Sequence, residues 1–217
     1  MPSMPAHRSV VRRHHSRPLA ALGLVLAGLW PLADALAWSL SIAAAPRRVF
    51  LHVGNGVADG NSATVNLVQV TVPGAQVGNG VAQAMTTNST QSQSLYGDNY
   101  TTCPTPASQI MVGASYRRSN AANGPASATL RVTSPADLVN ASGDTIPFSQ
   151  IGWTVSAAGS SVPGVIPAGS FNGATQTLTS IPANTYIENC HTFSYANSAV
   201  RAAGTYTGQV TYTLTSP

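Results

Sequence analysis

Apolar and polar residues alternate along most of the chain after residue 37, with the two-residue period of a β-strand that buries one face. The clearest run is the last one, in which Tyr206, Gly208, Val210, Tyr212 and Leu214 alternate with threonine and glutamine. Threonine suits the solvent-facing positions of a strand. This run therefore predicts a closing strand with one face in a core.

Shorter runs of the same kind predict further strands, and clusters of Gly, Pro, Asn and Asp separate them as turns. No window carries a sustained 3.6-residue apolar period, so no helix is expected. Together the runs predict an all-β fold, a single immunoglobulin-like antiparallel β-sandwich over residues 38–217. The runs are residues 38–44, 48–53, 62–72, 109–115, 126–134, 146–157, 175–181 and 191–196.

Residues 1–37 have the three parts of a signal peptide that is cleaved on export. Residues 7–17 are basic, residues 19–32 are apolar, and Ala35-Leu36-Ala37 matches the small-x-small rule for cleavage. A membrane anchor is the alternative, but the apolar stretch has about 14 residues, whereas a spanning helix needs roughly 20. We therefore expect a cleaved leader and no membrane span in the mature chain.

The formal net charge of +4 belongs largely to the leader. Four of the ten basic residues precede residue 20, and the chain has no lysine. Six arginines and five acidic residues follow residue 37, so the mature chain is nearly neutral. Such a domain has no broad field that attracts a phosphate backbone, and we expect no nucleic-acid partner.

A seven-residue pattern occurs twice, as residues 53–59 (VGNGVAD) and residues 77–83 (VGNGVAQ). Two similar Asn-Gly turns at the ends of a strand pair are the simplest interpretation. A pair of matching binding loops is the alternative.

Cys103 and Cys190 are the only cysteines, and an even pair in an exported chain usually forms a disulfide. The alternative is a metal site that combines the cysteines with His191 and His52. Cys190 and His191 are adjacent, and adjacent residues of a strand point to opposite faces, so they cannot easily hold one ion. We expect a disulfide, no metal and no cofactor.

The sequence carries no motif for a catalytic nucleophile, because Gly-x-Ser-x-Gly is absent and Ser-x-x-Lys requires lysine. Glycosidase chemistry needs two carboxylates across one bond, and few acidic residues are present. Asp98 and Asp144 have turn-like neighbours, where Asp often bonds its own backbone. These two residues and Glu188 are predicted to have turn and surface roles, so we expect no enzymatic activity.

The segment 86–103 (TTNSTQSQSLYGDNYTTC) is polar and ends at Cys103. Long loops on rigid sheets often carry binding residues. Tyr96, Asp98 and Tyr100 are therefore candidates for an exposed recognition loop. A loop that the cysteine holds in place without any partner is the alternative.

Residues 203–214 (AGTYTGQVTYTL) resemble the last strand of bacterial surface and fimbrial β-sandwich domains. These include pilin-like subunits, spore-coat-U-like secreted pilins and WxL-type cell-wall-binding domains, which often end with Gly-Thr-Tyr and the same alternation. The resemblance implies an immunoglobulin-like sandwich with a structural or adhesive role. It transfers no functional residue.

These observations favour an exported structural or adhesive surface subunit in the periplasm, at the cell surface or outside the cell. Its expected partners are other surface or pilus subunits and a periplasmic chaperone. The alternative is a secreted binding module that recognises a glycan or a protein through its loops. Residues 38–42 (WSLSI) alternate large apolar with small polar side chains, so this segment is expected to pair as a first strand with a sheet edge of its own domain, which costs no association entropy. Addition of this strand to a neighbouring subunit is the alternative.

N-terminal sequencing of the exported protein tests the leader. We expect the sequence to begin at Trp38, because cleavage follows the small-x-small site that ends at Ala37. A chain that keeps residues 1–37 and fractionates with membranes would contradict the prediction.

Overall fold

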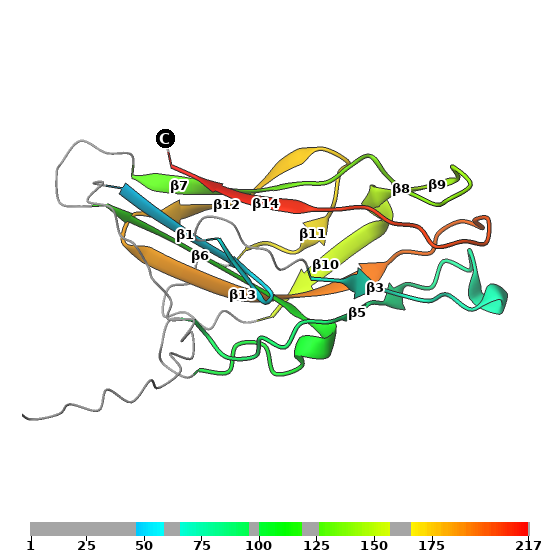
Figure 1. Ribbon diagram of the computed structural model, residues 1–217, viewed down its shortest axis with the longest axis horizontal. Coiled ribbons are helices and arrows are strands. Elements are labelled where there is room, and N and C mark those ends of the chain that lie inside the picture. The colour runs from blue at the N-terminus through cyan, green and yellow to red at the C-terminus, as the bar shows by residue number, and fades with distance from the viewer. Residues whose placement is uncertain (1–46, 59–65, 96–99, 119–125, 157–165, 217) are drawn as a thin grey trace, which may run out of the picture. The chain divides into compact units, whose positions relative to one another are not determined.

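The computed structural model describes five stretches of the chain, all within the compact unit Leu40–Pro217. The leader and the expected strand at 38–44 lie outside the described residues, as do Tyr96 and Asp98. Strands dominate the described part, which contains only three short 3-10 helices (Figure 1). The described stretches are residues 47–58, 66–95, 100–118, 126–156 and 166–216.

The larger of the two main sheets has seven strands, and all its pairs are antiparallel. The strand order is β11-β10-β13-β6-β1-β2, and β4 also pairs with β13. The strands are β1 (Arg47–Val53), β2 (Gly56–Ala58), β4 (Gln83–Ala84), β6 (Ile110–Arg118), β10 (Ile151–Val155), β11 (Gly169–Ser170) and β13 (Thr185–Tyr195).

The smaller main sheet has three antiparallel strands in the order β12-β7-β14. These are β7 (Ser127–Thr133), β12 (Thr175–Pro182) and β14 (Thr211–Thr215). Two short pairs complete the described strands. They are β3 (Val68–Gln69) with β5 (Thr86–Thr87), and β8 (Asp137–Val139) with β9 (Thr145–Pro147). The 3-10 helices are η1 (Gly74–Gln76), η2 (Pro106–Ser108) and η3 (Phe148–Gln150).

One apolar core lies between the two main sheets, which makes the fold a β-sandwich. Val112 of β6 and Ile187 of β13 are buried in the same cluster as Leu130 and Val132 of β7. Burial of each such side chain contributes roughly 1.5–3 kcal/mol. Arg131, between these two residues, and Thr133, which follows them, are exposed, so the alternation read from the sequence of β7 is confirmed.

The order β1-β6-β13-β10 is that of strands A, B, E and D in an immunoglobulin-type sheet. In the sequence, β10 also comes before β13, as strand D comes before strand E. The opposite sheet has its own order, with β7 in the centre. The expected all-β antiparallel sandwich is confirmed.

The expected strand at 146–157 is wrong in its length, because η3 interrupts it. This turn buries Phe148, whose ring packs edge-on against Phe171 with centroids 5.2 Å apart. Gly208 lies against the same ring, and a Cβ at this position would be 2.7 Å from it. A side chain at 208 would displace Phe148, so glycine is required there.

The two copies of the VGNGVA pattern have different roles. In the first, residues Gly54 and Asn55 form the two-residue turn between β1 and β2, with a positive φ of 57° at Gly54, as the first central position of a hairpin turn often needs. In the second, the backbone N–H of Gly78 donates to the side chain of Asn197, and no hairpin follows. The interpretation as two similar hairpin turns is wrong for the second copy.

Candidate functional site

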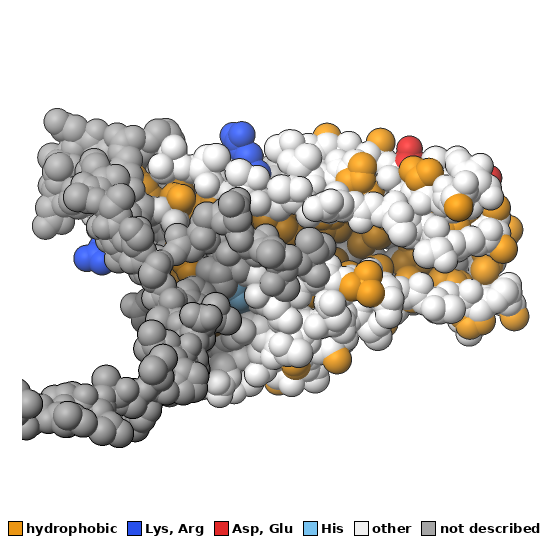
Figure 2. Space-filling model, in the orientation of Figure 1, with side chains coloured by type: hydrophobic (Ala, Val, Ile, Leu, Met, Phe, Trp, Pro, Cys, Tyr) orange, Lys and Arg blue, Asp and Glu red, His pale blue; other side chains and the backbone are white. Residues whose placement is uncertain are grey.

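Half-buried apolar side chains line a hollow that opens between the two sheets, which we call the front groove. One wall is the extended run 66–73, in which every second residue is half-buried. The other wall is the run 206–214, in which Tyr206, Val210 and Tyr212 are half-buried, Leu214 is buried and Gly208 is exposed. Figure 2 shows apolar side chains gathered in this hollow, between the runs that Figure 1 labels β3 and β14. The half-buried side chains packed against the core are Val68, Val70 and Val72 on the first wall and Tyr206, Val210 and Tyr212 on the second.

On both walls of the front groove, part of the backbone is not paired with any described strand. In the described part of the chain, β14 bonds to β7 on one side and to no other strand. The run before β14 forms a single bridge, in which Thr207 and Val139 exchange two N–H···O bonds of 3.0 Å. On the other wall, β3 pairs with β5 over two residues only. Edges of this kind accept an added strand.

Tyr212 also belongs to an aromatic cluster that reaches the middle of the core. Its ring meets that of His191 edge-on, with centroids 6.5 Å apart, and His191 stacks parallel to Trp153 at 6.1 Å. His191 is fully buried, and neither ring nitrogen has a hydrogen-bond partner. Burial lowers the pKa of His191 from 6.5 to about 3, so the ring is neutral at pH 7. Burial also raises the pKa of Tyr212.

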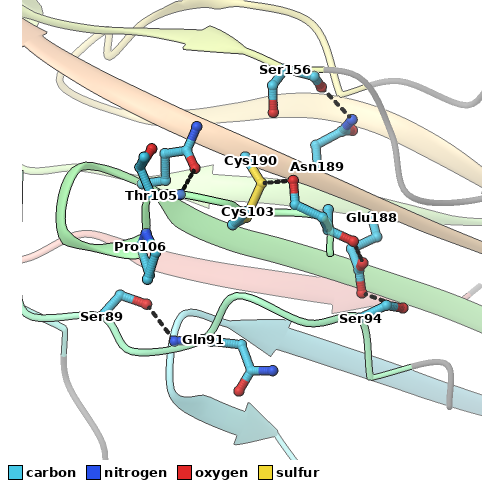
Figure 3. The surroundings of a disulfide bond; sticks show 12 residues. Ser89, Gln91, Ser94, Cys103, Thr105, Pro106, Ser156, Glu188, Asn189 and Cys190 are labelled. Atoms are coloured by element: carbon cyan, nitrogen blue, oxygen red, sulfur yellow. Dashed lines mark hydrogen bonds between the residues drawn. A yellow bond between two sulfur atoms is a disulfide. The ribbon is translucent and has the colours of Figure 1, made fainter. Parts of the chain in front are cut away.

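The outer face of the larger sheet, away from the core, is covered by the chain between β5 and β6. Cys103 in this cover is joined to Cys190 of β13 by a disulfide, with Cα atoms 5.5 Å apart (Figure 3). The disulfide that the sequence predicts is therefore present. Both sulfur atoms lie in a small buried cluster with Met111 of β6. Cys190 and His191 do face opposite sides of β13, as expected.

Glu188 is the polar centre beneath this cover. It is fully buried and faces outward from β13, two residues before Cys190 (Figure 3). The hydroxyl groups of Thr102 and Tyr186 donate to its two carboxylate oxygens. The Ser94 hydroxyl donates to Oε2 over 3.2 Å, and the backbone N–H of Leu95 donates over 3.4 Å. The predicted surface role of Glu188 is wrong, because a distant segment covers it.

A glycine on β6 makes this arrangement possible. Gly113 lies opposite Glu188 in the strand register, and a Cβ there would be 2.7 Å from the Tyr186 hydroxyl. Any side chain at 113 would push the tyrosine away from the carboxylate. The polar centre therefore needs Gly113, Tyr186 and Glu188 together.

His52 of β1 lies beside this polar centre. It is almost fully buried, and its Nδ1 has no hydrogen-bond partner. Burial lowers the pKa of His52 from 6.5 to about 4, although the Glu188 carboxylate and a backbone hydrogen bond with Gly54 partly oppose the shift. At neutral pH the buried carboxylate therefore faces an uncharged imidazole. In the described part of the chain, the Glu188 carboxylate accepts hydrogen bonds from hydroxyl groups and one backbone N–H.

The expected recognition loop is partly described. Tyr96 and Asp98 lie outside the described residues, whereas Tyr100 is 52% exposed. The segment folds back on itself, because the Ser94 N–H donates to the Tyr100 carbonyl and the Cys103 N–H donates to the Ser92 carbonyl. The described parts of the segment, residues 86–95 and 100–103, are therefore bonded to each other, and the disulfide fixes them to the sheet.

The described residues contain no group of three or more His, Cys, Asp or Glu side chains that could hold a metal ion. Asp144, another of the acidic residues, accepts a hydrogen bond of 2.9 Å from Asn140 within the β8–β9 turn, which agrees with its expected turn role. No helix within the described stretches has the length and apolar character needed to cross a membrane. No family model, curated protein or solved structure matches the chain.

Replacing Glu188 tests the polar centre. We expect Glu188→Ala to lower the free energy of unfolding by about 3 kcal/mol or more, because several buried donors lose their acceptor. Glu188→Gln keeps one carbonyl oxygen and should lose clearly less. Urea unfolding with the disulfide intact measures both, and equal losses in the two variants would contradict the assignment.

Acid should destabilise the β-sandwich through two buried histidines, His52 and His191. Their folded-state pKa values of about 4 and about 3 lie below the unfolded value. The unfolded chain then binds more protons as the pH falls below 6.5, so stability is complete above this pH and declines below it. Each histidine should contribute a slope approaching about 1.4 kcal/mol per pH unit.

Urea unfolding of the mature chain between pH 7 and pH 5 measures this slope. His191→Phe keeps an aromatic ring among Trp153, Phe193 and Tyr212, and it should remove about half of the slope. An unchanged slope in that variant would show that His191 does not titrate on unfolding.

Proposed function

We propose that this chain is an exported, non-catalytic structural subunit of a surface assembly, whose copies join by adding a strand at the front groove. The observation that carries the proposal is an apolar groove bordered by incompletely paired backbone on both walls. Main-chain hydrogen bonds to the edges supply affinity in strand addition, and pockets for alternate side chains supply specificity.

The occupant that fits is the segment 38–44 of another copy. Trp38, Leu40 and Ile42 alternate with serines, and in a strand such positions lie on one face about 7 Å apart. On the first groove wall the half-buried residues recur with the same period of two from residue 66 to residue 72, and on the second wall Val210, Tyr212 and the buried Leu214 do so. Three large side chains facing the core would therefore meet apolar walls at a matching spacing.

Assembly of this kind requires protection of the groove before a partner arrives. An edge strand beside exposed apolar surface is a template for unwanted pairing. A periplasmic chaperone that covers the groove of each newly exported subunit would meet this need. The proposed partners are thus other copies or related surface subunits, and such a chaperone.

A second candidate function is a binding module that recognises a glycan or a protein. The exposed Tyr100 on the disulfide-fixed cover favours it, because aromatic side chains on rigid supports are common binding residues. Such a module would remain a monomer and would lose its ligand on Tyr100→Ala without any change in assembly.

Deletion of residues 38–44 from the mature chain tests strand addition. If the segment fills the groove of a neighbour, the shortened chain should stay folded, with an unchanged thermal midpoint, and should form no polymers in size-exclusion chromatography. A synthetic peptide of residues 38–44 should then bind to the shortened chain.

Point variants supply the matched control. Leu40→Ser with Ile42→Ser should abolish polymers, whereas Ser39→Ala with Ser41→Ala should not, because the serines face away from the groove in this arrangement. A deletion that destabilises the monomer would show instead that the segment pairs within its own domain. A deletion without any effect would contradict both arrangements.

A further inference from the structure

Four of the six arginines that follow residue 37 meet at one end of the larger sheet. The strand β1 begins with Arg47 and Arg48, and β6 ends with Arg117 and Arg118. The register sets Arg47 opposite Arg118 and Arg48 opposite Arg117. We call these four residues the basic end.

The exposed acidic groups of the described residues lie at the other end of the sheet. Asp137 and Asp144 belong to the β8–β9 hairpin, which we call the acidic tip, whereas Glu188 is buried. Figure 1 shows β8 and β9 at the end opposite to the start of β1.

The length of β13, the central strand, gives the distance between the basic end and the acidic tip. Thr185 at the start of β13 pairs with Tyr116, next to the basic end, and Tyr195 at its finish pairs with Ile151. A strand advances about 3.3 Å per residue, so the ten steps of β13 span about 33 Å. Charges this far apart in one copy interact little at physiological salt.

Strand addition would bring the two ends of different copies together. The segment 38–44 precedes Arg47 by three residues, which span at most about 11 Å. The groove of the receiving copy lies beside its acidic tip, because Val139 of β8 is bridged to Thr207 of the groove wall. A segment seated there antiparallel to β14, so that residue 44 lies nearest to Thr207, leaves the basic end of its own copy close to the acidic tip of the next.

We propose that the basic end docks on the acidic tip of a second copy and orients head-to-tail growth. The inference rests on the proposed function, since it needs the strand that links the copies. Arginine guanidinium groups pair with carboxylates through two parallel hydrogen bonds. Such charge pairs accelerate encounter and reject the wrong orientation. The contact joins two different surfaces, so it builds an open chain rather than a closed dimer.

Charge reversal on each side tests the docking. Arg117 is exposed, and Asp137 is partly exposed without a role in the Asn140–Asp144 turn. The variants Arg117→Asp and Asp137→Arg of the mature chain should each slow polymer growth, followed by light scattering, by roughly tenfold at low salt. An equal mixture of the two should recover most of the rate, because each reversed end then meets an opposite charge.

The control variant is Arg131→Asp, at an exposed position in the middle of β7. It makes the same change of net charge as Arg117→Asp, away from both ends, and should leave the rate unchanged. Thermal midpoints confirm that all variants are folded. High salt should slow the wild-type chain toward the rate of the variants.

Several results would overturn the docking. Polymer growth that is insensitive to salt and to both reversals would do so, while leaving strand addition intact. Slowing by Arg117→Asp without rescue in the mixture would show that the arginines bind some other anion. Equal slowing by Arg131→Asp would show an effect of net charge alone. A wild-type chain that forms no polymers would overturn the proposed function and the docking together.

Discussion

The larger sheet depends on the burial of β13 on both of its faces. Ile187 lies in the core between the sheets, and its neighbour Glu188 lies fully buried beneath the cover on the outer face. A shift of the strand by one residue would exchange the two faces and place the carboxylate in the apolar core. An ionised group there without partners is strongly unfavourable. The alternation of Ile187, Glu188 and the disulfide-bonded Cys190 therefore allows one register only.

That register also places the wall of the front groove. Asn197 follows β13 and is buried with a positive φ of 53°. Its side-chain amide donates to the Gln76 carbonyl over 2.7 Å and accepts from the Gly78 N–H over 2.8 Å. The run 66–73 enters this turn directly. The position of the groove wall 66–73 therefore depends on β13, although this wall is not part of β13.

The sequence predicts the strands that bury one face, and it also predicts most of β6, which is buried on both faces, but it misses the first half of β13. In β7 and in β14, the alternation identifies the inward positions correctly, but the predicted closing strand is too long, because β14 begins only at Thr211 and Gly208 is exposed. In β13, the polar residues Glu188 and Asn189 interrupt any apolar pattern, so only the second half of the strand is predicted. Both are fully buried, because their partners come from segments that are far away in the chain.

The candidate site divides in the same way. The disulfide follows from the number of cysteines, which requires no knowledge of the fold. The polar centre around Glu188 depends on Thr102 and Ser94, and no local sequence pattern shows that these residues contact Glu188. The front groove depends on which strand edges remain without neighbours, and this is a property of the whole topology. The alternation at 38–42 predicts a strand that pairs with an edge, but it does not identify the edge.

The central position of β13 also sets the order in which the protein can fold. A ribosome, or an export channel that threads the chain from its N-terminus, delivers β1 and β6 long before residues 185–195. Until then, β6 lacks its neighbour on one side, and Cys103 has no thiol with which to pair. The strand pairs of the sheet centre are distant in sequence, and folds of this kind close slowly. Oxidation of the cysteines is therefore a late step, and it reports that the centre of the sheet has formed.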